Sequence, residues 1–347
     1  MSRWAVVLAG GVGSRFWPLS TPERPKQLLP LVTDQPLLAD ALERLAPLAD
    51  AEHTLVLTNA TLAEAVRGVA PALPAANVIA EPRPAGTAAA LAWAAAEIER
   101  RDGPGAVMIS IHADWAVRDA GRFRAALAAA ADAAERHEAL VTVGVVPSRP
   151  DPGFGYIAPG MPVDGALRRV DRFVEKPTRE RAAEMVAGGY LWNSGIFVWR
   201  VGDFLAELRA HTTELGSALP FLADARGRER FFGAVSSPVS VDVGVLERSA
   251  RVLVIPGDFG WDDIGTWGAL ARVRQPDAGG NALSGAAHAV QATGNVVHAE
   301  GSTVVLYGVE HLVVVAREGL VLVTTVDRSA ELKTLLDALP PEVRERA

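Results

Sequence analysis

The chain has 347 residues, of which 49% are hydrophobic, so it can bury a large core in one domain or in two. The formal net charge of −7 gives no general basic surface, which argues against nucleic-acid partners and requires any polyanionic ligand to meet locally placed cations. The absence of cysteine excludes disulfides, thiolate zinc sites and cysteine nucleophiles, and it favours a reducing, cytoplasmic setting.

Up to about Arg274, short apolar runs alternate with longer Ala- and Leu-rich segments of helical period, which is typical of repeated βα units. We therefore predict an α/β, Rossmann-like fold with a mixed, mostly parallel sheet flanked by helices. The predicted strands are Ala5–Ala9, Thr54–Leu57, Val107–Ile111, Leu140–Val146, Val170–Val174, Gly195–Trp199 and Val252–Ile255. The predicted helices are Leu37–Ala46, Thr87–Arg101, Ala120–His137, Arg179–Gly188 and Val201–His211, with Thr87 as the cap of its helix. The first apolar run is too short to span a bilayer and lacks a signal-peptide pattern, so we expect no membrane partner.

After the polar stretch 275–280 the pattern changes to short β-rich runs broken by glycine. We place a domain boundary there, with one domain at 1–275 and a second at 276–347. The runs suggest one or two coils of a β-solenoid, similar to a left-handed β-helix, closed by a helix near Ser329–Leu339. Dimerisation of two copies through this appendage is a hypothesis.

A glycine-rich loop, Gly10-Gly11-Val12-Gly13-Ser14, directly follows the first predicted strand. Glycine lacks a Cβ and tolerates positive φ, so such a loop can bring backbone amides close to phosphate oxygens. It is not a Walker A loop, because no Gly-Lys-Ser/Thr follows at the required spacing. It fits dinucleotide binding poorly, because Phe16 stands where the third glycine is expected. On the loop alone, a plain tight turn remains an alternative.

Two cations follow the loop, Arg15 at its end and Lys26 shortly after, and both can converge on one triphosphate. Lys26 is one of only three lysines among 34 basic residues, the others being Lys176 and Lys333. A lysine retained in such an arginine-rich chain indicates a place where a compact ammonium suits better than a guanidinium.

The run from Gly10 to Arg15, followed by Phe16-Trp17-Pro18-Leu19 and Pro25-Lys26-Gln27, resembles the opening signature of the nucleotidyltransferases that make nucleotide sugars. Within that family it is most similar to the mannose-1-phosphate guanylyltransferases, and the resemblance covers residues 1 to about 330. It implies GTP and mannose 1-phosphate as substrates, GDP-mannose and diphosphate as products, and Mg²⁺ or another divalent cation. It also implies a set of nucleotide-binding positions: Leu8, Ala9, Gly10, Gly11, Gly13, Ser14, Arg15, Lys26, Glu81, Pro82, Gly86 and Thr87.

Two aspartates are the candidate metal ligands. Asp114 follows the predicted strand Val107–Ile111, at the edge where open α/β sheets place ligands, and a helix N-cap before Ala116 is the alternative. The segment containing Asp262 and Asp263 resembles the family's Trp-Asp-Asp-Val-Gly motif. Asp263 is the expected ligand, because Mg²⁺ prefers a few carboxylates together with phosphate oxygens and water. For Asp262 the alternatives are support of the ligands or capping of a helix at Thr266.

The sugar phosphate is expected at the end of the strand Val170–Val174, where Glu175-Lys176-Pro177 follows. By resemblance, Glu175 accepts hydrogen bonds from sugar hydroxyls and Lys176 neutralises the sugar phosphate, whereas a surface ion pair is the alternative. Gly155 and Asn193 match further sugar-side positions. Segment 240–247 is expected to shape the sugar pocket.

A dianionic sugar phosphate can attack the α-phosphorus without a general base, so placement and charge neutralisation are enough. Arg15, Lys26, Asp114 and Asp263 are the predicted catalytic residues. Three other functions remain to be weighed. They are the same reaction with glucose 1-phosphate, another sugar 1-phosphate or another nucleotide as substrate, a catalytically silent sensor of nucleotide sugars, and an NAD-dependent oxidoreductase. The first is left open because Ala85-Gly86 replaces the family's Arg-Asn beside the base.

Overall fold

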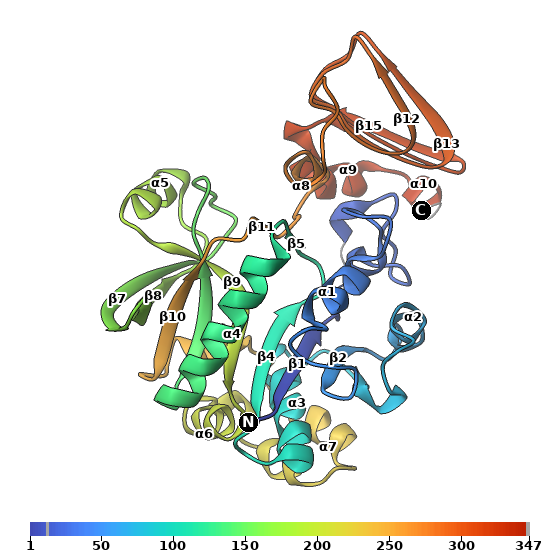
Figure 1. The fold of residues 1–347 in the computed structure, drawn as a ribbon. Coiled ribbons are helices and arrows are strands. Elements are labelled where there is room, and N and C mark those ends of the chain that lie inside the picture. Colours follow the sequence, from blue (N-terminus) through green and yellow to red (C-terminus); the bar gives the residue numbers. More distant parts are fainter. Residues whose placement is uncertain (12–13, 345–347) are drawn as a thin grey trace. The chain divides into compact units, whose positions relative to one another are not determined.

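The computed structural model describes residues 1–11 and 14–344, and the fold forms two compact units (Figure 1). The first unit contains residues 1–10, 42–112 and 119–260, and the second contains residues 11–41, 113–118 and 261–347. The chain therefore passes between the units several times. In the part of the chain that is described, no helix has both the length and the apolar character that a membrane span requires.

The first unit is built on a nine-stranded sheet with the strand order β3-β2-β1-β4-β9-β6-β10-β8-β7. Neighbours are parallel from β3 to β4 and between β10 and β6, whereas β9 runs antiparallel to both β4 and β6. The strands are β1 (Arg3–Leu8), β2 (Thr54–Asn59), β3 (Val78–Glu81), β4 (Val107–His112), β6 (Leu140–Val145), β7 (Tyr156–Asp164), β8 (Leu167–Val174), β9 (Leu191–Arg200) and β10 (Val252–Gly257).

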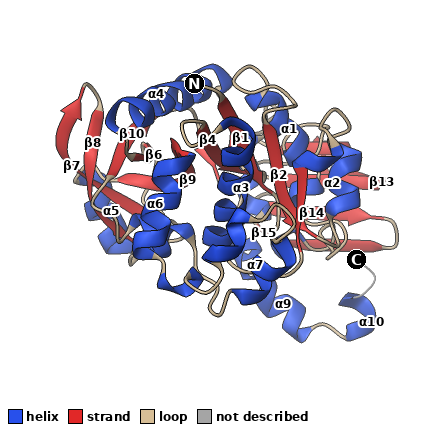
Figure 2. Cartoon of the chain, turned by 90° about the horizontal axis from the view of Figure 1, so that it is seen from below, coloured by secondary structure: helices blue, strands red, loops and turns tan. Residues whose placement is uncertain are grey.

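Helices cover both faces of this sheet, with α4 on one side of the strands and α6 and α7 on the other (Figure 2). The helices of this unit are α2 (Ala63–Val69), α3 (Thr87–Asp102), α4 (Ala120–His137), α5 (Arg179–Ala187), α6 (Val201–His211) and α7 (Arg228–Ala234), and α1 (Leu37–Leu45) has residues in both units. The Ala-rich run of α3, which includes Trp93, is buried and packs with aromatic side chains of other helices such as Phe204 and Phe231. The α/β fold with a mixed, largely parallel sheet flanked by helices is thus confirmed.

Strand β7, which contains Pro159 and Pro162, was not among the strands predicted from the sequence. Proline is tolerated in an edge strand, and β7 is at the edge of the sheet with irregular register at both prolines.

The expected cap of α3 was wrong. Gly86 is the N-cap residue, and the hydroxyl of Thr87 accepts a hydrogen bond from the backbone N–H of Val241 at 2.9 Å instead.

In the second unit, a four-stranded sheet follows the order β12-β13-β14-β15. The strands are β12 (Ala282–Val290), β13 (Val296–Tyr307), β14 (Leu312–Arg317) and β15 (Leu320–Thr325), followed by α9 (Leu332–Ala338) and α10 (Pro341–Arg344). The first two pairings are parallel and the last is antiparallel. Asn281 and Asn295 stack at equivalent places before β12 and β13, with Asn295 donating to the Asn281 side chain at 2.8 Å. Because the sheet is mixed, the β-solenoid remains a prediction.

The core of this unit joins segments that are distant in sequence. Phe16, Trp17 and Leu19 pack with Trp267, which precedes the short helix α8 (Leu270–Val273), and with Val313 of β14. The Trp267 indole donates a hydrogen bond to the backbone oxygen of Trp17 at 3.0 Å. This packing fixes the segment that carries Lys26 to the C-terminal part of the chain.

Candidate active site

Lys26 is the most tightly held of the predicted catalytic residues. It begins the short 3₁₀ helix Lys26–Leu28 after Pro25, and its side chain is only 8% exposed. The ammonium Nζ donates to Asp114 Oδ2 at 3.0 Å and to the backbone oxygen of Asp263 at 2.5 Å. A buried ammonium requires such partners, because desolvation penalises a charge that has none. One lysine therefore bonds to both candidate metal ligands.

A short pair of strands brings the two aspartates together. Asp114 lies in the turn between β4 and β5 (Ala116–Val117), so the alternative of a helix N-cap before Ala116 was wrong. Strand β5 pairs antiparallel with β11 (Trp261–Asp262), with Ala116 opposite Asp262. Asp114 precedes one strand and Asp263 follows the other, and in an antiparallel pair these two ends coincide.

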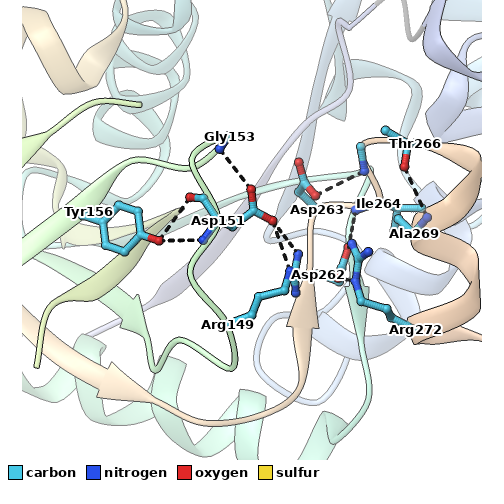
Figure 3. A network of polar contacts seen from close by, with 11 residues as sticks. Arg149, Asp151, Gly153, Tyr156, Asp262, Asp263, Ile264, Thr266, Ala269 and Arg272 are labelled. Carbon is cyan, nitrogen blue, oxygen red and sulfur yellow. Dashed lines mark hydrogen bonds and ion pairs between the residues drawn. The ribbon is translucent and has the colours of Figure 1, made fainter. Parts of the chain in front are cut away.

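The turn after β11 is fixed by its own side chains (Figure 3). Ile264 has φ +48°, which is strained for a β-branched residue, and its N–H donates to Asp262 Oδ1 at 2.9 Å. Asp262 is buried and forms an ion pair with Arg272 at 2.7 Å. Thr266 caps the helical turn that follows, so Asp262 is not that cap. Asp262 therefore stabilises the turn that presents Asp263.

These residues line one cavity of about 360 Å³, which is within the range of small-molecule sites. Its lining consists of Arg15, Phe16, Lys26, Asp114, Trp115, Asp263, Ile264 and Gly265. The structure thus gathers all four predicted catalytic residues around one space inside the second unit. Of the glycine loop, Val12, Gly13 and the side chain of Ser14 lie outside the described residues.

Apart from the glycine itself and its two chain neighbours, no residue described in the structure has an atom within 4 Å of a Cβ built on Gly10 or Gly11. Leu8 and Ala9, the other predicted nucleotide contacts here, are buried at the end of β1. The backbone oxygen of Ala9 accepts a hydrogen bond from Thr58 at 3.2 Å. Packing among the described residues therefore does not explain why positions 10 and 11 are glycine.

A second group of predicted residues meets inside the first unit. A Cβ built on Gly155 would lie 2.7 Å from Glu175 Oε2 and 3.4 Å from the Asn193 Cβ. The backbone N–H of Asn193 donates to the Gly155 oxygen at 2.8 Å. Gly155 is therefore the residue that allows Glu175 and Asn193 to approach each other.

Lys176 extends this group but is held loosely. Its ammonium lies 3.5 Å from Glu175 Oε1, and the two side chains are 70% and 65% exposed. Its φ is +40°, in the left-handed region that lysine rarely adopts. The strained backbone fixes the direction in which the Glu175-Lys176 pair leaves the end of β8.

The predicted base-recognition segment lies elsewhere in the first unit. Glu81 ends β3 and is followed by Pro82, and burial raises the pKa of the Glu81 carboxyl to about 7. Gly86 has φ +83°, and a Cβ there would lie 2.3 Å from the Val239 oxygen. This close approach leaves no room for a side chain at position 86.

Two features of the site were missed by sequence reasoning. The guanidinium of Arg149 lies over the rings of Trp192 and Phe154, at 5.1 and 5.5 Å from their centroids. It also forms an ion pair with Asp151 at 2.9 Å (Figure 3). Arg149 and Asp151 follow β6 as Asp114 follows β4, so the same strand-end pattern could have found them. The second is Asp242, whose carboxylate accepts a hydrogen bond from the Asn193 side chain at 2.7 Å.

The chain is similar to known proteins in both sequence and structure. Residues 4–280 match the family model described as nucleotidyl transferase. The chain is 36% identical to the xanthan biosynthesis protein XanB of Xanthomonas campestris, over 99% of this chain and 74% of that one. It is 34% identical to a mannose-1-phosphate guanylyltransferase of Escherichia coli, over 98% of this chain and 74% of that one.

Among solved structures, one described as mannose-1-phosphate geranyltransferase from Thermus thermophilus superposes with a TM-score of 0.87 at 37% identity. It covers 97% of this chain and 100% of that one. A match of this extent in both sequence and structure shows that the chain is a nucleotidyltransferase and belongs to the nucleotidyl transferase family.

Proposed function

We propose that this chain catalyses the reaction of GTP with mannose 1-phosphate to give GDP-mannose and diphosphate. The observation that carries the proposal is the bonding of one buried lysine, Lys26, to both Asp114 and Asp263 on a single cavity. The names of relatives that are more than 30% identical over nearly the whole chain support the choice of substrates.

The chemistry needs no proton transfer at the reacting centre. A phosphate oxygen of mannose 1-phosphate forms a bond to the α-phosphorus of GTP, and the bond from that phosphorus to the β-phosphate oxygen breaks, which releases diphosphate. Both reactants are anions, so the barrier comes largely from charge repulsion and from alignment. Arg15 and Lys26 supply positive charge, and Lys26 is already fixed in place by two hydrogen bonds.

The donor set fits a divalent cation. Asp114 and Asp263 line the same cavity, and carboxylates together with phosphate oxygens are what Mg²⁺ prefers. Among the described residues, no group of three or more His, Asp or Glu side chains could hold a metal ion, so a bound ion would complete its coordination with oxygens of the nucleotide and of water. When bound there, the ion would neutralise charge on the phosphates.

The remaining predicted contacts divide between nucleotide and sugar. Gly10 and Gly11 leave space at the end of β1 for close approach of phosphate, and Glu81, Pro82, Gly86 and Thr87 form the proposed base side. An ionised Glu81 would accept hydrogen bonds from the N–H groups of guanine, which adenine lacks at those positions. Gly155, Glu175, Lys176 and Asn193 form the proposed sugar-phosphate side.

Several further proposals accompany this function. They are the division at about residue 275, the β-solenoid character of residues 276–347, a homodimer formed through them, and a cytoplasmic location. Membership of the nucleotidyl transferase family argues against an NAD-dependent oxidoreductase. The experiment below distinguishes the proposed reaction from a catalytically silent sensor and from an enzyme that uses a different sugar phosphate.

The test is to incubate the purified protein with Mg²⁺, each nucleoside triphosphate and a panel of sugar 1-phosphates, and to measure diphosphate release. We expect the highest rate with GTP and mannose 1-phosphate, and a loss of roughly 10²-fold or more in the Asp263→Asn variant. A higher rate with glucose 1-phosphate would replace mannose as the substrate. No release with any pair would reject the proposal and favour the sensor.

A further inference from the structure

The side chain of Asn193 has a defined orientation. Its Nδ2 donates to Asp242 Oδ1 at 2.7 Å, and its Oδ1 accepts from the backbone N–H of Gly195 at 3.3 Å. A carboxylate can only accept hydrogen bonds, so Asp242 requires the nitrogen of the amide to face it. The second hydrogen of Nδ2 and the remaining lone pair of Oδ1 are then presented in fixed directions.

The backbone at Asp242 has an unusual conformation. It is the first residue of a single π-helical turn, Asp242–Leu246, in which the N–H of Glu247 donates to the Asp242 oxygen at 2.8 Å. Such turns are rare and occur frequently at functional sites. The sequence between 239 and 247 contains no glycine or proline that would force this geometry except Gly244. The tertiary contacts of the segment must therefore help to hold it.

Those contacts come from the start of α3. The N–H of Val241 donates to Thr87 Oγ1 at 2.9 Å, and the N–H of Ala88 donates to the Val239 oxygen at 3.2 Å. This approach is possible because position 86 is glycine, since a Cβ built there would lie 2.3 Å from the Val239 oxygen. Segment 239–242 is thus attached at one side to the proposed base-recognition segment and at the other to Asn193.

The charges around Asn193 argue for a ligand rather than for stability. The pKa of Glu247 is raised by partial burial and by the nearby charges of Asp242 and Glu175. Arg248 acts on the pKa of Glu247 in the opposite direction, and Lys176 lies 3.5 Å from Glu175, so the carboxylates here are only partly balanced by cations. A ligand with several hydroxyl groups offers donors to such acceptors, and a hexose phosphate is of that class.

We propose that Asp242 is a positioning residue that fixes the Asn193 amide for the hydroxyls of the sugar, and that Thr87 sets Asp242 in place through Val241. The inference rests on the proposed function and deepens it. It links the recognition of the base to that of the sugar through four consecutive residues, 239–242.

The first test compares Asp242→Asn, Asn193→Ala and the double variant, with Asp337→Asn in the exposed part of α9 as the matched control. An asparagine at 242 has the size of aspartate but can also donate, so the amide of Asn193 is free to turn over. We expect the KM for mannose 1-phosphate to rise about tenfold in Asp242→Asn while the KM for GTP changes less than about twofold. The double variant should be no worse than Asn193→Ala alone, because both remove one interaction.

A second pair of variants tests the link to α3. Thr87→Val removes the acceptor for the Val241 N–H at nearly constant size, and we expect the KM for mannose 1-phosphate to rise roughly threefold or more. Thr87→Ser retains a hydroxyl and should restore the wild-type value. Thermal denaturation of each variant shows whether it is folded.

Additive effects of Asp242→Asn and Asn193→Ala, or an unchanged KM for the sugar phosphate in Asp242→Asn, would overturn the inference while leaving the proposed function intact. Wild-type protein that is active only with another sugar phosphate would require the same comparison with that substrate. Wild-type protein that releases no diphosphate with any pair would reject both.

Discussion

Two of the three lysines in this chain occupy opposite environments. Lys26 in the second unit is 8% exposed and bonds to Asp114 and to the backbone of Asp263, whereas Lys176 in the first unit is 70% exposed and lies 3.5 Å from Glu175. A charge that is already fixed needs no reorganisation when the transition state forms, so it can lower the barrier itself. An exposed charge on a flexible stem serves to capture an anion. The difference predicts separate kinetic roles for the same residue type.

The largest effect is expected at Lys26. Lys26→Ala removes a fixed positive charge beside two aspartates, and we expect kcat to fall by about 10²-fold or more. Lys26→Arg should not restore activity, because the planar guanidinium does not fit a space shaped for an ammonium with two partners. Steady-state kinetics of diphosphate release measure both.

Lys333→Ala, in the exposed part of α9, is the matched control and should behave as wild type. A kcat for Lys26→Ala within about threefold of that control would break the comparison, since the buried lysine would then be structural.

A smaller effect is expected at Lys176. Lys176→Ala should raise the KM for mannose 1-phosphate by roughly tenfold and lower kcat by less, because substrate capture is lost and not the fixed charge. Lys176→Arg should restore most of the affinity, since an exposed side chain has room for a guanidinium. The same Lys-to-Arg change would then fail at one position and succeed at the other. A kcat loss at Lys176 equal to that at Lys26 would contradict the division of roles.

The smallest effect is expected at Glu81, where burial raises the pKa of the carboxyl from 4.5 to about 7. The folded state therefore binds a proton more tightly than the unfolded state, and this contribution to stability is present below about pH 4.5 and lost as the pH rises through about 7. Glu81→Gln should remove that loss, which amounts to at most about 3 kcal/mol. Thermal denaturation at pH 5 and pH 8 measures it.

We expect the wild type to lose more stability than Glu81→Gln between these two pH values. The control is Glu64→Gln, at an exposed position of α2, which should retain the wild-type dependence. Equal pH dependence in the wild type and Glu81→Gln would show that the charge of Glu81 is solvated.

The fold was largely predictable because its signals are local. The period of residues 120–137 predicted the bounds of α4, and the apolar runs located β1, β4 and β6 to within a residue or two. Strand β7 was missed because its prolines are compatible with a strand only at an edge, and an edge is a property of the whole sheet.

The candidate site was predictable where chemistry follows a strand end, as at Asp114. The bond between Asn193 and Asp242 was not, because the two residues are 49 positions apart and the pairing depends on a π-helical turn that has no sequence signature. The hydroxyl of Thr87 was misassigned for the same reason. A local rule gave it the role of a helix cap, whereas a distant N–H of Val241 is its partner.

The π-helical turn at 242–246 makes this region sensitive to the length of the chain as well as to its chemistry. A deletion of one residue between 243 and 246 would favour an ordinary α-helical turn, and the residues on one side of the deletion would rotate by roughly 100° about the helix axis. Asp242 and Glu247 could not then both keep their present directions. Single-residue deletions here should therefore be far more harmful than substitutions of the apolar side chains in the same turn, a pattern opposite to that of ordinary surface loops.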